Sequence, residues 1–405
     1  MTGTITPALP DIPSKWDIIP IHTSDVSSFL RCRRYWNWSS PARNNLRTKA
    51  AVSGVNPNLW FGTGIHWALE QYYHPLLRRD PVEAWQTWFH TQWYGGDVEQ
   101  SWLEMTYDNN PHPQADGTFK VRGLQDILPQ YDEEEYFGYR DLGTGMMTFY
   151  KNYAEENDDF EIVATESVFS IPLGFESIDT REDSPNYGQL VEVHARGKRD
   201  TIIYWPRRDA FGVRDHKTAA KVDEEYFSKL DSDPQVSTYL WASREEAKLH
   251  DRPWGQINEC MYEVLRKKYP SPPTPLANGL PSVSRTNESA TAKMFSDYIE
   301  EHNLQVWYDI NEKAQLYYNF LVTEGDKRFI ERKTTFRSNA YLDNVGAQIA
   351  DIAKEMLSPD LALYPRYTND NNCLKCAFRA PCLTMQDNQD YQFILDNNYE
   401  KNRGR

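Results

Sequence analysis

Long apolar runs are absent from this chain, and none approaches the roughly 20 residues that a helix needs to cross a bilayer. The N-terminal residues also lack a basic segment followed by an apolar one, so they do not signal secretion. Hydrophobic residues make up 40% of the sequence and charged residues 25%, a balance typical of globular proteins that dissolve in water. We therefore expect a cytoplasmic protein that has no membrane partner.

Basic residues are scarce in relation to acidic ones. The 405 residues include 44 Lys and Arg against 59 Asp and Glu, which gives a net charge of −15. This balance argues against a protein that coats nucleic acid over its whole surface, because such proteins are usually basic. It is compatible with a local basic groove beside a site rich in carboxylates.

Helix and strand patterns divide the chain, and their character changes near residue 160. Apolar and β-branched segments predict a meander of strands at 161–172, 189–195, 200–205 and 211–215. Periodicity and capping residues predict helices that start near Thr23, after Gly64 and at Asp233-Pro234, and others at 82–105, 141–156, 287–303 and 338–358. Segments 106–135 and 269–286 are expected to be surface loops, the second because it contains five prolines.

These elements predict an α/β core with helical additions at both ends, within one domain. The expected boundaries are an extended arm at 1–22, the main domain at 23–385 and a tail at 386–405. Within the main domain we expect a helical insertion at about 80–158, the core at about 160–268, and a helical and cysteine-rich region at about 287–385.

An acid and a lysine lie two residues apart in the segment Asp215-His216-Lys217. Side chains alternate along a strand, so Asp215 and Lys217 are expected to share a face. Phosphodiester hydrolysis uses such a pair, because carboxylates hold Mg²⁺ or Mn²⁺ and a lysine stabilises developing negative charge. The motif alone is weak evidence, since an exposed ion pair has the same pattern, as have Glu246-Ala247-Lys248 and Glu331-Arg332-Lys333.

Residues around this pair strengthen the interpretation. Asp200 lies 15 residues upstream, which suits two neighbouring strands whose acids share a metal ion. Gln235 and Tyr239 are spaced to share one helix face and to contact a phosphate or a base, although an ordinary half-buried face has the same spacing. His66, one turn before Glu70, would be a neutral ligand near a helix N-terminus, or a structural histidine.

The five cysteines fall into two groups. Cys373, Cys376 and Cys382 form a C-x2-C-x5-C cluster, and Cys32 is the natural candidate for a fourth ligand. In a cytoplasmic chain this spacing favours a metal over a disulfide. Zinc and a four-iron four-sulfur cluster both remain open. Cys260 is expected to be a buried structural thiol.

Taken together, these motifs resemble the RecB-like branch of the PD-(D/E)XK nucleases that carry an iron–sulfur cluster. That group includes AddB-type nucleases, exonucleases of CRISPR adaptation and phage-encoded exonucleases. The resemblance spans roughly residues 24 to 385 and rests on these segments: 28–35, 62–66, 197–200, 215–218, Gln235 with Tyr239, and the three C-terminal cysteines. Segments 82–140 and 269–286 do not match the family pattern.

The resemblance implies a mixed sheet flanked by helices and a role for each motif residue. His66, Asp200 and Asp215 would bind Mg²⁺ or Mn²⁺, assisted by the His216 carbonyl. Lys217 would be the catalytic lysine, and Gln235 and Tyr239 the family's Q-x3-Y pair. Glu166 would add a further carboxylate. The resemblance also favours a 4Fe-4S cluster over zinc at the four cysteines, which would join the two ends of the domain.

The leading hypothesis is a metal-dependent DNA exonuclease that acts on single strands or DNA ends. It would serve recombination, replication or repair, with proteins of those pathways as partners, in the host cytoplasm if a phage encodes it. One alternative is a DNA-end-binding scaffold that keeps the fold without cutting, and another is an unrelated structural protein that binds zinc. The sequence leaves open the polarity of digestion, the strand preference, endo- versus exonuclease behaviour and the oligomeric state.

Basic residues near aromatic ones are the candidate DNA contacts. Arg31, Arg33 and Arg34 are interleaved with aromatic residues at 35, 36 and 38, a combination that suits single strands. Lys267 and Lys268 precede the Pro-rich segment and could contact phosphates. An alternative is that the aromatic side chains are core and the basic ones merely solvated.

Overall fold

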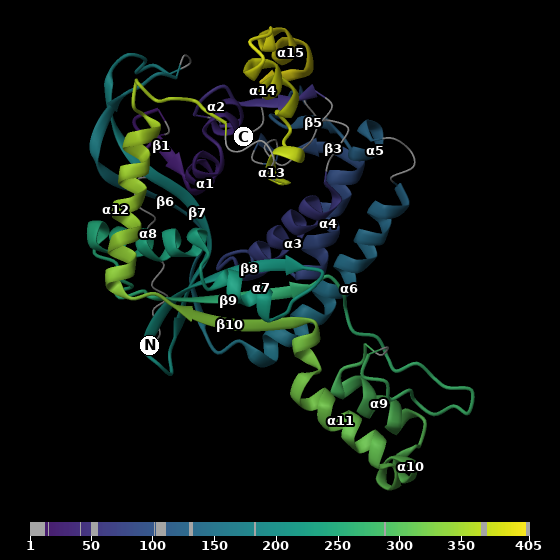
Figure 1. Ribbon diagram of the computed structural model, residues 1–405. Helices are drawn as coiled ribbons and strands as arrows, with labels where there is room; N and C mark the ends of the chain where they lie inside the picture. The colour runs from purple at the N-terminus through teal and green to yellow at the C-terminus, as the bar shows by residue number, and fades with distance from the viewer. Residues whose placement is uncertain are drawn as a thin grey trace.

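The computed structural model describes residues 13–14, 16–40, 42–49, 56–100, 102, 111–128, 133–181, 184–286, 289–365 and 371–401. A mixed sheet with helices against both faces forms its centre (Figure 1). The α/β class and the mixed sheet expected from the sequence are therefore confirmed. A search of the described helices for a membrane span found none.

Six strands form the central sheet, in the order β1-β7-β8-β9-β10 with β6 also paired to β7. Two pairs are parallel, β1 with β7 and β8 with β9, and the other pairs are antiparallel. The strand bounds are β1 (Ile19–His22), β6 (Glu161–Ile178), β7 (Leu190–Trp205), β8 (Ala210–Ala219), β9 (Glu259–Arg266) and β10 (Ile330–Phe336). Strands β1 and β10 lie outside the core boundaries expected from the sequence.

Strand β7 is continuous where the sequence predicted two strands with a break at Gly197, and that prediction was wrong. Gly197 serves close packing instead of a turn. A Cβ atom at this position would lie 2.6 Å from Cζ of Phe169, so only glycine lets the β6 ring lie against β7.

Helices cover both faces of the sheet. One layer holds α3 (Pro57–Tyr73), α4 (Pro81–Tyr94) and α6 (Glu133–Asn157), and its buried core is rich in tryptophan. The other holds α7 (Glu224–Leu230), α8 (Pro234–His250) and α12 (Asn339–Met356), which runs along β6 and β7 (Figure 1). Helix α1 (Thr23–Arg31) lies beside α12.

Two helix starts show how capping chemistry sets the boundaries. Helix α8 begins as predicted, because the Asp233 carboxylate accepts a hydrogen bond from the Gln235 amide at 2.8 Å and Pro234 occupies the first turn. Helix α3 begins at Pro57, not after Gly64 as predicted, because Asn56 caps it. Gly64 lies inside α3, where a Cβ atom would come within 2.4 Å of the Trp88 ring.

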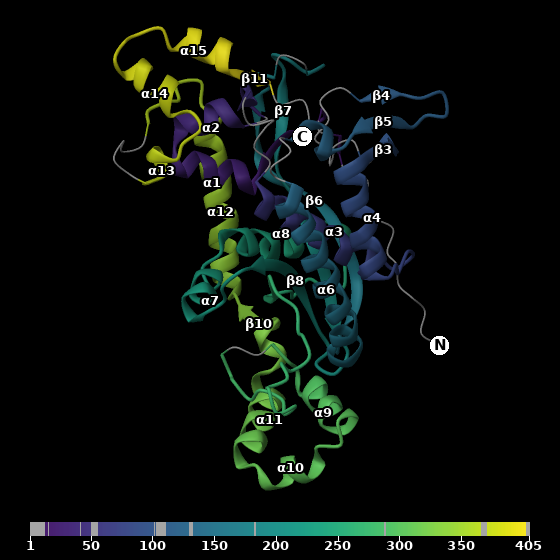
Figure 2. The same cartoon turned by 90° about the vertical axis from the view of Figure 1, so that its right-hand side faces the viewer.

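The remaining elements extend the body at its two ends, which Figures 1 and 2 both show as opposite. Helices α9 (Ala292–Glu301), α10 (Gln305–Ile310) and α11 (Glu312–Glu324) and the 3-10 turn η4 (Asp326–Arg328) form a lobe that projects at one end, below β10. At the other end lie α2 (Arg33–Ser39), β2 (Leu46–Thr48), α13 (Asn371–Leu374), α14 (Arg379–Gln386), α15 (Tyr391–Asn398) and β11 (Tyr399–Lys401). A small sheet beside α4 holds β3 (Gly95–Val98), β4 (His112–Pro113) and β5 (Phe119–Arg122), followed by α5 (Leu124–Ile127).

Several predicted segments differ in detail. The helix predicted at 82–105 ends at Tyr94 and gives way to β3. Within the predicted loop 106–135, residues 111–128 carry β4, β5 and α5, whereas 106–110 and 129–132 lie outside the described residues. The segment expected to be a tail carries α15 and β11. The Pro-rich segment 269–286 has no helix or strand, as predicted.

Candidate active site

Strand β8 carries the acid and the lysine expected to act together. Val213 and Ala219 pack toward α8, and alternation places Asp215 and Lys217 on the same face between them. The Lys217 Nζ atom lies 2.8 Å from Asp215 Oδ2. The Asp215 side chain is only 2% exposed, whereas Lys217 is 23% exposed and reaches solvent.

Asp200 lies opposite Asp215 on the neighbouring strand β7. The two strands are antiparallel and Thr201 pairs with Arg214, so the next position along the register places Asp200 opposite Asp215. The Oδ2 atom of Asp200 accepts a hydrogen bond from the His216 backbone amide at 2.9 Å and lies 3.5 Å from Nδ1 of His66. The two acids and the histidine therefore converge from β7, β8 and α3.

Helix α8 completes the site from one side. The Lys217 ammonium donates to Gln235 Oε1 at 3.1 Å, and Gln235 Nε2 donates to the Tyr239 hydroxyl at 2.7 Å. A chain of polar contacts thus runs from Asp215 through Lys217 and Gln235 to Tyr239. The i, i+4 spacing predicted that Gln235 and Tyr239 share a helix face, and the contact between Gln235 and Lys217 joins that face to β8.

A second group of charges lies on the other side of Asp200. Glu166 occupies the β6 position between the pairs Thr165–Thr201 and Ser167–Arg199, which places it opposite Asp200. Its φ of 45° is in the left-handed region that a non-glycine residue rarely adopts, a strain that recurs at functional sites. The Glu166 carboxylate forms an ion pair with Lys198.

Crowding and burial disturb the protonation of these acids. Burial and the nearby Asp200 raise the pKa of Glu166 to about 7, although Lys198 opposes the shift. Burial also raises the pKa of Asp215 to about 7, with Lys217 opposing and Asp200 adding to the increase. Burial raises the pKa of Glu70 as well. A bound cation would relieve this repulsion, because it favours the ionised form of every carboxylate near it.

The pKa values of the two basic groups, His66 and Lys217, shift in opposite directions. Burial lowers the pKa of His66, which favours the neutral ring that a metal ligand requires, although Asp200 opposes this. Burial opposes the charge on Lys217, but Asp215 outweighs burial and raises the pKa of the ammonium group. Lys217 therefore stays protonated at neutral pH and acts as a hydrogen-bond donor, not as a base.

Behind the site lies a buried ionic network that the sequence did not predict. The His216 imidazole lies 3.6 Å from Asp200 Oδ2 on one side and 3.2 Å from Glu263 Oε2 on the other. Glu263 is fully buried, pairs with Arg214 and with Arg332 of β10, and accepts a hydrogen bond from the Tyr150 hydroxyl at 2.6 Å. The sequence did contain a signal for this network, because charged residues interrupt the otherwise apolar strands β8 and β9.

The other two acid-x-Lys motifs are used elsewhere. Glu246 forms a buried ion pair with Arg199, and Lys248 lies 2.6 Å from Glu245. Glu331 pairs with Arg266 at 3.2 Å, while Lys333 pairs with Asp231 at 3.0 Å. Neither motif brings its acid and lysine together as Asp215 and Lys217 do.

A sequence model of the PD-(D/E)XK nuclease superfamily matches residues 23–383. The chain belongs to this superfamily. Its members generally hydrolyse phosphodiester bonds in nucleic acids and typically use Mg²⁺ or Mn²⁺. A search of curated proteins finds no match to the chain. The match spans both the site described above and the cysteines at the chain ends.

The donors of this superfamily member are of the type that Mg²⁺ and Mn²⁺ take. Carboxylate oxygens of Asp200, Asp215 and Glu166 and the ring nitrogen of His66 border the site. Among the described side chains, only Lys217 contacts the buried Asp215 carboxylate. This carboxylate could therefore also bind a metal cation. Among the described residues, no group of three His, Cys, Asp or Glu side chains is already arranged to hold a metal ion.

The four cysteines from the two ends of the nuclease domain line one small cavity. Cys32 joins Cys373, Cys376 and Cys382 there, and all four are free thiols. Burial raises the pKa of Cys376, and the other three thiols add to the increase. Trp38 and Phe378 pack beside the cavity and shield it. Cys260, by contrast, is fully buried in β9, as expected.

The candidate DNA-binding residues of this nuclease superfamily member divide into two classes. Arg33 forms an ion pair with Glu355, and Arg34 donates to the Cys382 carbonyl at 3.3 Å and to its Sγ at 3.4 Å. Arg31 is exposed, with its guanidinium 5.3 Å from the centre of the Tyr35 ring. The structure thus gives two of the three predicted arginines protein partners and leaves Arg31 facing solvent.

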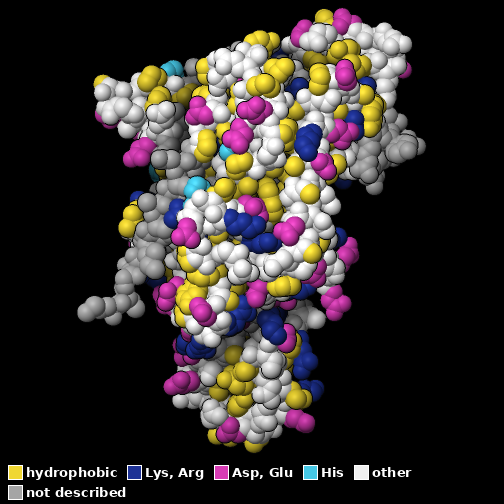
Figure 3. Space-filling model, turned by 90° about the vertical axis from the view of Figure 1, so that its left-hand side faces the viewer, with side chains coloured by type: hydrophobic (Ala, Val, Ile, Leu, Met, Phe, Trp, Pro, Cys, Tyr) yellow, Lys and Arg dark blue, Asp and Glu magenta, His cyan; other side chains and the backbone are white. Residues whose placement is uncertain are grey.

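The two candidate lysines lie beyond the ends of β8 and β9. Lys267 donates to Asn58 Oδ1 at 2.7 Å, and Lys268 lies over the Phe329 ring at 5.1 Å. Burial lowers the pKa of both. Figure 3 shows Lys and Arg side chains gathered where the α9–α11 lobe joins the body, with Asp and Glu scattered over the same face. Positive charge is thus local, despite the negative net charge.

Proposed function

We propose that this chain is a metal-dependent DNA exonuclease that hydrolyses phosphodiester bonds at DNA ends or in single strands. The observation that carries the proposal is the convergence of Asp200, Asp215 and Lys217 on the neighbouring strands β7 and β8, with Gln235 and Tyr239 beside them. The superfamily match supports hydrolysis of nucleic acid. Recombination, replication or repair of DNA is the process that such an activity would serve.

His66, Asp200 and Asp215 would hold Mg²⁺ or Mn²⁺, with the His216 carbonyl assisting and Glu166 as a further carboxylate. When bound, the ion supplies Lewis acidity at the phosphate and activates water at neutral pH. Lys217 would donate to a phosphate oxygen or orient the attacking water, because its ammonium group keeps its charge.

Gln235 and Tyr239 would position the substrate in this mechanism. The Gln235 carbonyl oxygen accepts from Lys217 while its amide nitrogen donates to Tyr239, so the direction of each hydrogen bond is fixed. The Tyr239 hydroxyl then keeps its own hydrogen for a phosphate oxygen or a base. Burial raises the pKa of Tyr239, which keeps the phenol protonated.

We further propose that Cys32, Cys373, Cys376 and Cys382 bind a 4Fe-4S cluster, with zinc as the less favoured occupant. Four sulfur donors from the two ends of the domain around one shielded cavity support this assignment. A group bound there would hold the two ends of the domain together, because its loss would leave α2 and α14 joined by side-chain packing and by the hydrogen bonds from Arg34 to Cys382.

Closed substrates test the exonuclease activity. The purified full chain would be incubated with Mg²⁺ and either linear or circular single-stranded DNA of one sequence. We expect rapid loss of the linear DNA and survival of the circle. Cleavage of both at equal rates would identify an endonuclease. Binding without cleavage of either, in Mg²⁺ or Mn²⁺, would support the DNA-end-binding scaffold instead.

A further inference from the structure

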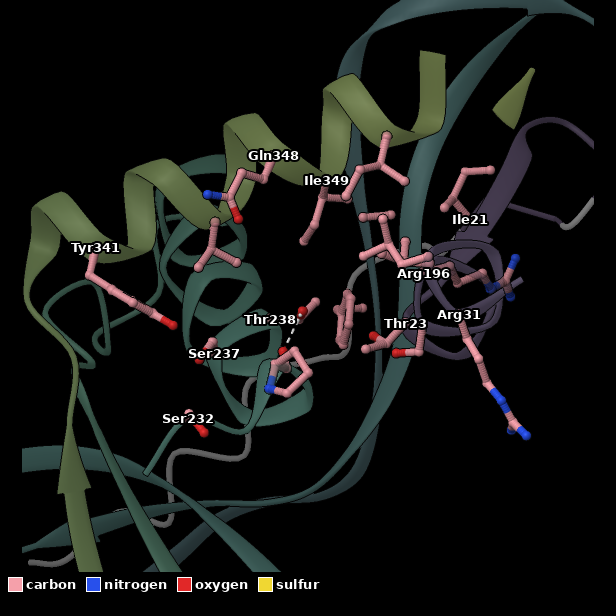
Figure 4. Close-up of a pocket in the computed structure, with 18 residues that line it drawn as sticks. Ile21, Thr23, Arg31, Arg196, Ser232, Ser237, Thr238, Tyr341, Gln348 and Ile349 are labelled. Atoms are coloured by element: carbon pink, nitrogen blue, oxygen red, sulfur yellow. Dashed lines mark hydrogen bonds between the residues drawn. The ribbon is translucent and has the colours of Figure 1, made fainter. Parts of the chain in front are cut away.

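A cavity of about 440 Å³ opens beside the candidate active site, between α1, α8, α12 and the strands β6 and β7 (Figure 4). Its walls are mainly apolar, with Phe169, Val345 and Ile349 among them. Hydroxyl and amide groups of Thr238, Gln348 and other residues interrupt the apolar surface. A volume of this size suits a small organic group such as a nucleobase with its sugar.

The cavity and the active site share a wall. The ring of Phe169 lines the cavity and also packs edge-on against Tyr239, with 6.0 Å between the ring centres. Helix α8 presents Ser237 and Thr238 to the cavity, whereas Gln235 of the same helix contacts Lys217. A strand of nucleic acid at the active site would therefore have this cavity as its neighbour.

Positive charge marks one end of the cavity. Arg31 and Arg196 both line it, and Figure 4 shows their side chains at the same end, opposite Tyr341 of α12. Arg196 donates to the Pro13 carbonyl at 3.2 Å, and Arg31 lies over the Tyr35 ring. Among the described residues that line the cavity there is no Asp or Glu. Both side chains point outward from this end, so an anion just outside it would lie near the two arginines, and the described lining adds no carboxylate.

We propose that this cavity takes the base of an unpaired DNA nucleotide, while a phosphate next to that base binds Arg31 and Arg196. The inference rests on the proposed function, which it deepens by adding a substrate-binding site beside the cleavage site. The base would lie against the apolar wall that Phe169, Val345 and Ile349 form, its polar edge near Thr238 and Gln348. Apolar burial of a base, together with arginine–phosphate contacts, holds a single strand without reading its sequence.

Equilibrium binding in EDTA tests this site separately from cleavage. The probe is a short fluorescein-labelled oligo(dT), compared with an oligonucleotide of equal length and charge that carries abasic sites. The full chain should bind oligo(dT) about tenfold more tightly than the abasic probe, as expected when one base is removed from water into an apolar cavity. Gln348→Trp, at an exposed position on the rim, should cover the cavity and abolish that preference.

Salt dependence tests the two arginines. Arg31→Ala and Arg196→Ala should each lower the slope of log affinity against log salt by about 0.7, the value for one lost contact to single-stranded phosphate. Arg208→Ala is the matched control, because Arg208 pairs with Glu259 away from the cavity. If both arginine variants keep the wild-type slope, or the abasic probe binds equally well, the inference is overturned even where metal-dependent cleavage is intact.

Discussion

The Nε2 atom of His216 lies 3.2 Å from Oε2 of Glu263, beneath the candidate active site. Because His216 also approaches Asp200, this contact joins the partly exposed Asp200 to the fully buried Glu263. Burial opposes the ionisation of Glu263, but Arg214 and Arg332 lower its pKa well below the usual range. Glu263 is therefore a permanent anion on which cations from β8 and β10 converge.

Replacing Glu263 tests this network. Glu263→Gln should lower the free energy of unfolding by about 3–5 kcal/mol, because it leaves the fully buried Arg214 without its counter-charge. Urea denaturation measures the effect. Glu259→Gln, on the same strand but more exposed, is the control and should cost about 1 kcal/mol or less. Equal small effects for both variants would show that Glu263 does not stabilise the sheet.

His216 is expected to position Asp200. His216→Ala keeps the backbone hydrogen bond to Asp200 but removes the imidazole, so Mn²⁺ affinity should fall about 10- to 100-fold. Calorimetric titration of the metal-free protein with Mn²⁺ measures the affinity, and His216→Asn should recover part of it. An unchanged Mn²⁺ affinity in His216→Ala would limit the imidazole to a structural role.

The pKa of Asp215 predicts how pH affects stability in the absence of metal. Its pKa is about 7 in the folded protein against an ordinary value of 3.8, so the folded state keeps this proton longer than the unfolded state. Stability should therefore fall as pH rises from about 4 to about 7, by roughly 2–4 kcal/mol from this group.

Thermal unfolding at pH 5 and pH 8, in EDTA and in Mg²⁺, measures this dependence. Mg²⁺ should raise the melting temperature more at the higher pH, where it competes with fewer protons for the carboxylates. Asp215→Asn should reduce the difference between the two pH values. The raised pKa of Asp215 would be contradicted if the melting temperature of the wild type in EDTA rose from pH 5 to pH 8 and Asp215→Asn showed the same rise.

The spacing of residues predicted much of this site. The two-residue interval predicted the shared face of Asp215 and Lys217, and the Asp233-Pro234 pair predicted the start of α8. Both are local properties of a strand or a helix end. The same local reasoning failed at Gly197, because the ring that requires a glycine there comes from another strand.

The remaining features depend on contacts between distant segments. Glu263 meets Arg214 and Arg332 only because β9 lies between β8 and β10, an order that no local pattern sets. Arg31 and Arg33 are near neighbours in sequence, yet only Arg33 reaches Glu355 of α12. Sequence alone could not assign these two arginines to different roles.

The cysteine cavity predicts a coloured protein. When the chain is purified without oxygen, it should be brown and contain about four iron atoms per chain. Cys32→Ser should lose the colour and unfold at a lower temperature, whereas Cys260→Ala should keep the colour, because Cys260 lies in β9 away from the cavity. A colourless wild type with one zinc per chain would exclude the cluster.

The most direct test of the account is single-turnover cleavage of end-labelled single-stranded DNA in Mg²⁺, in Mn²⁺ and in EDTA. The wild type should release label only with a metal ion. Asp200→Ala and Lys217→Ala should be slower by at least about 100- to 1,000-fold, whereas Lys221→Ala, at an exposed lysine beyond β8, should cleave like the wild type. Wild-type rates in Asp200→Ala or Lys217→Ala would show that these residues do not form the active site.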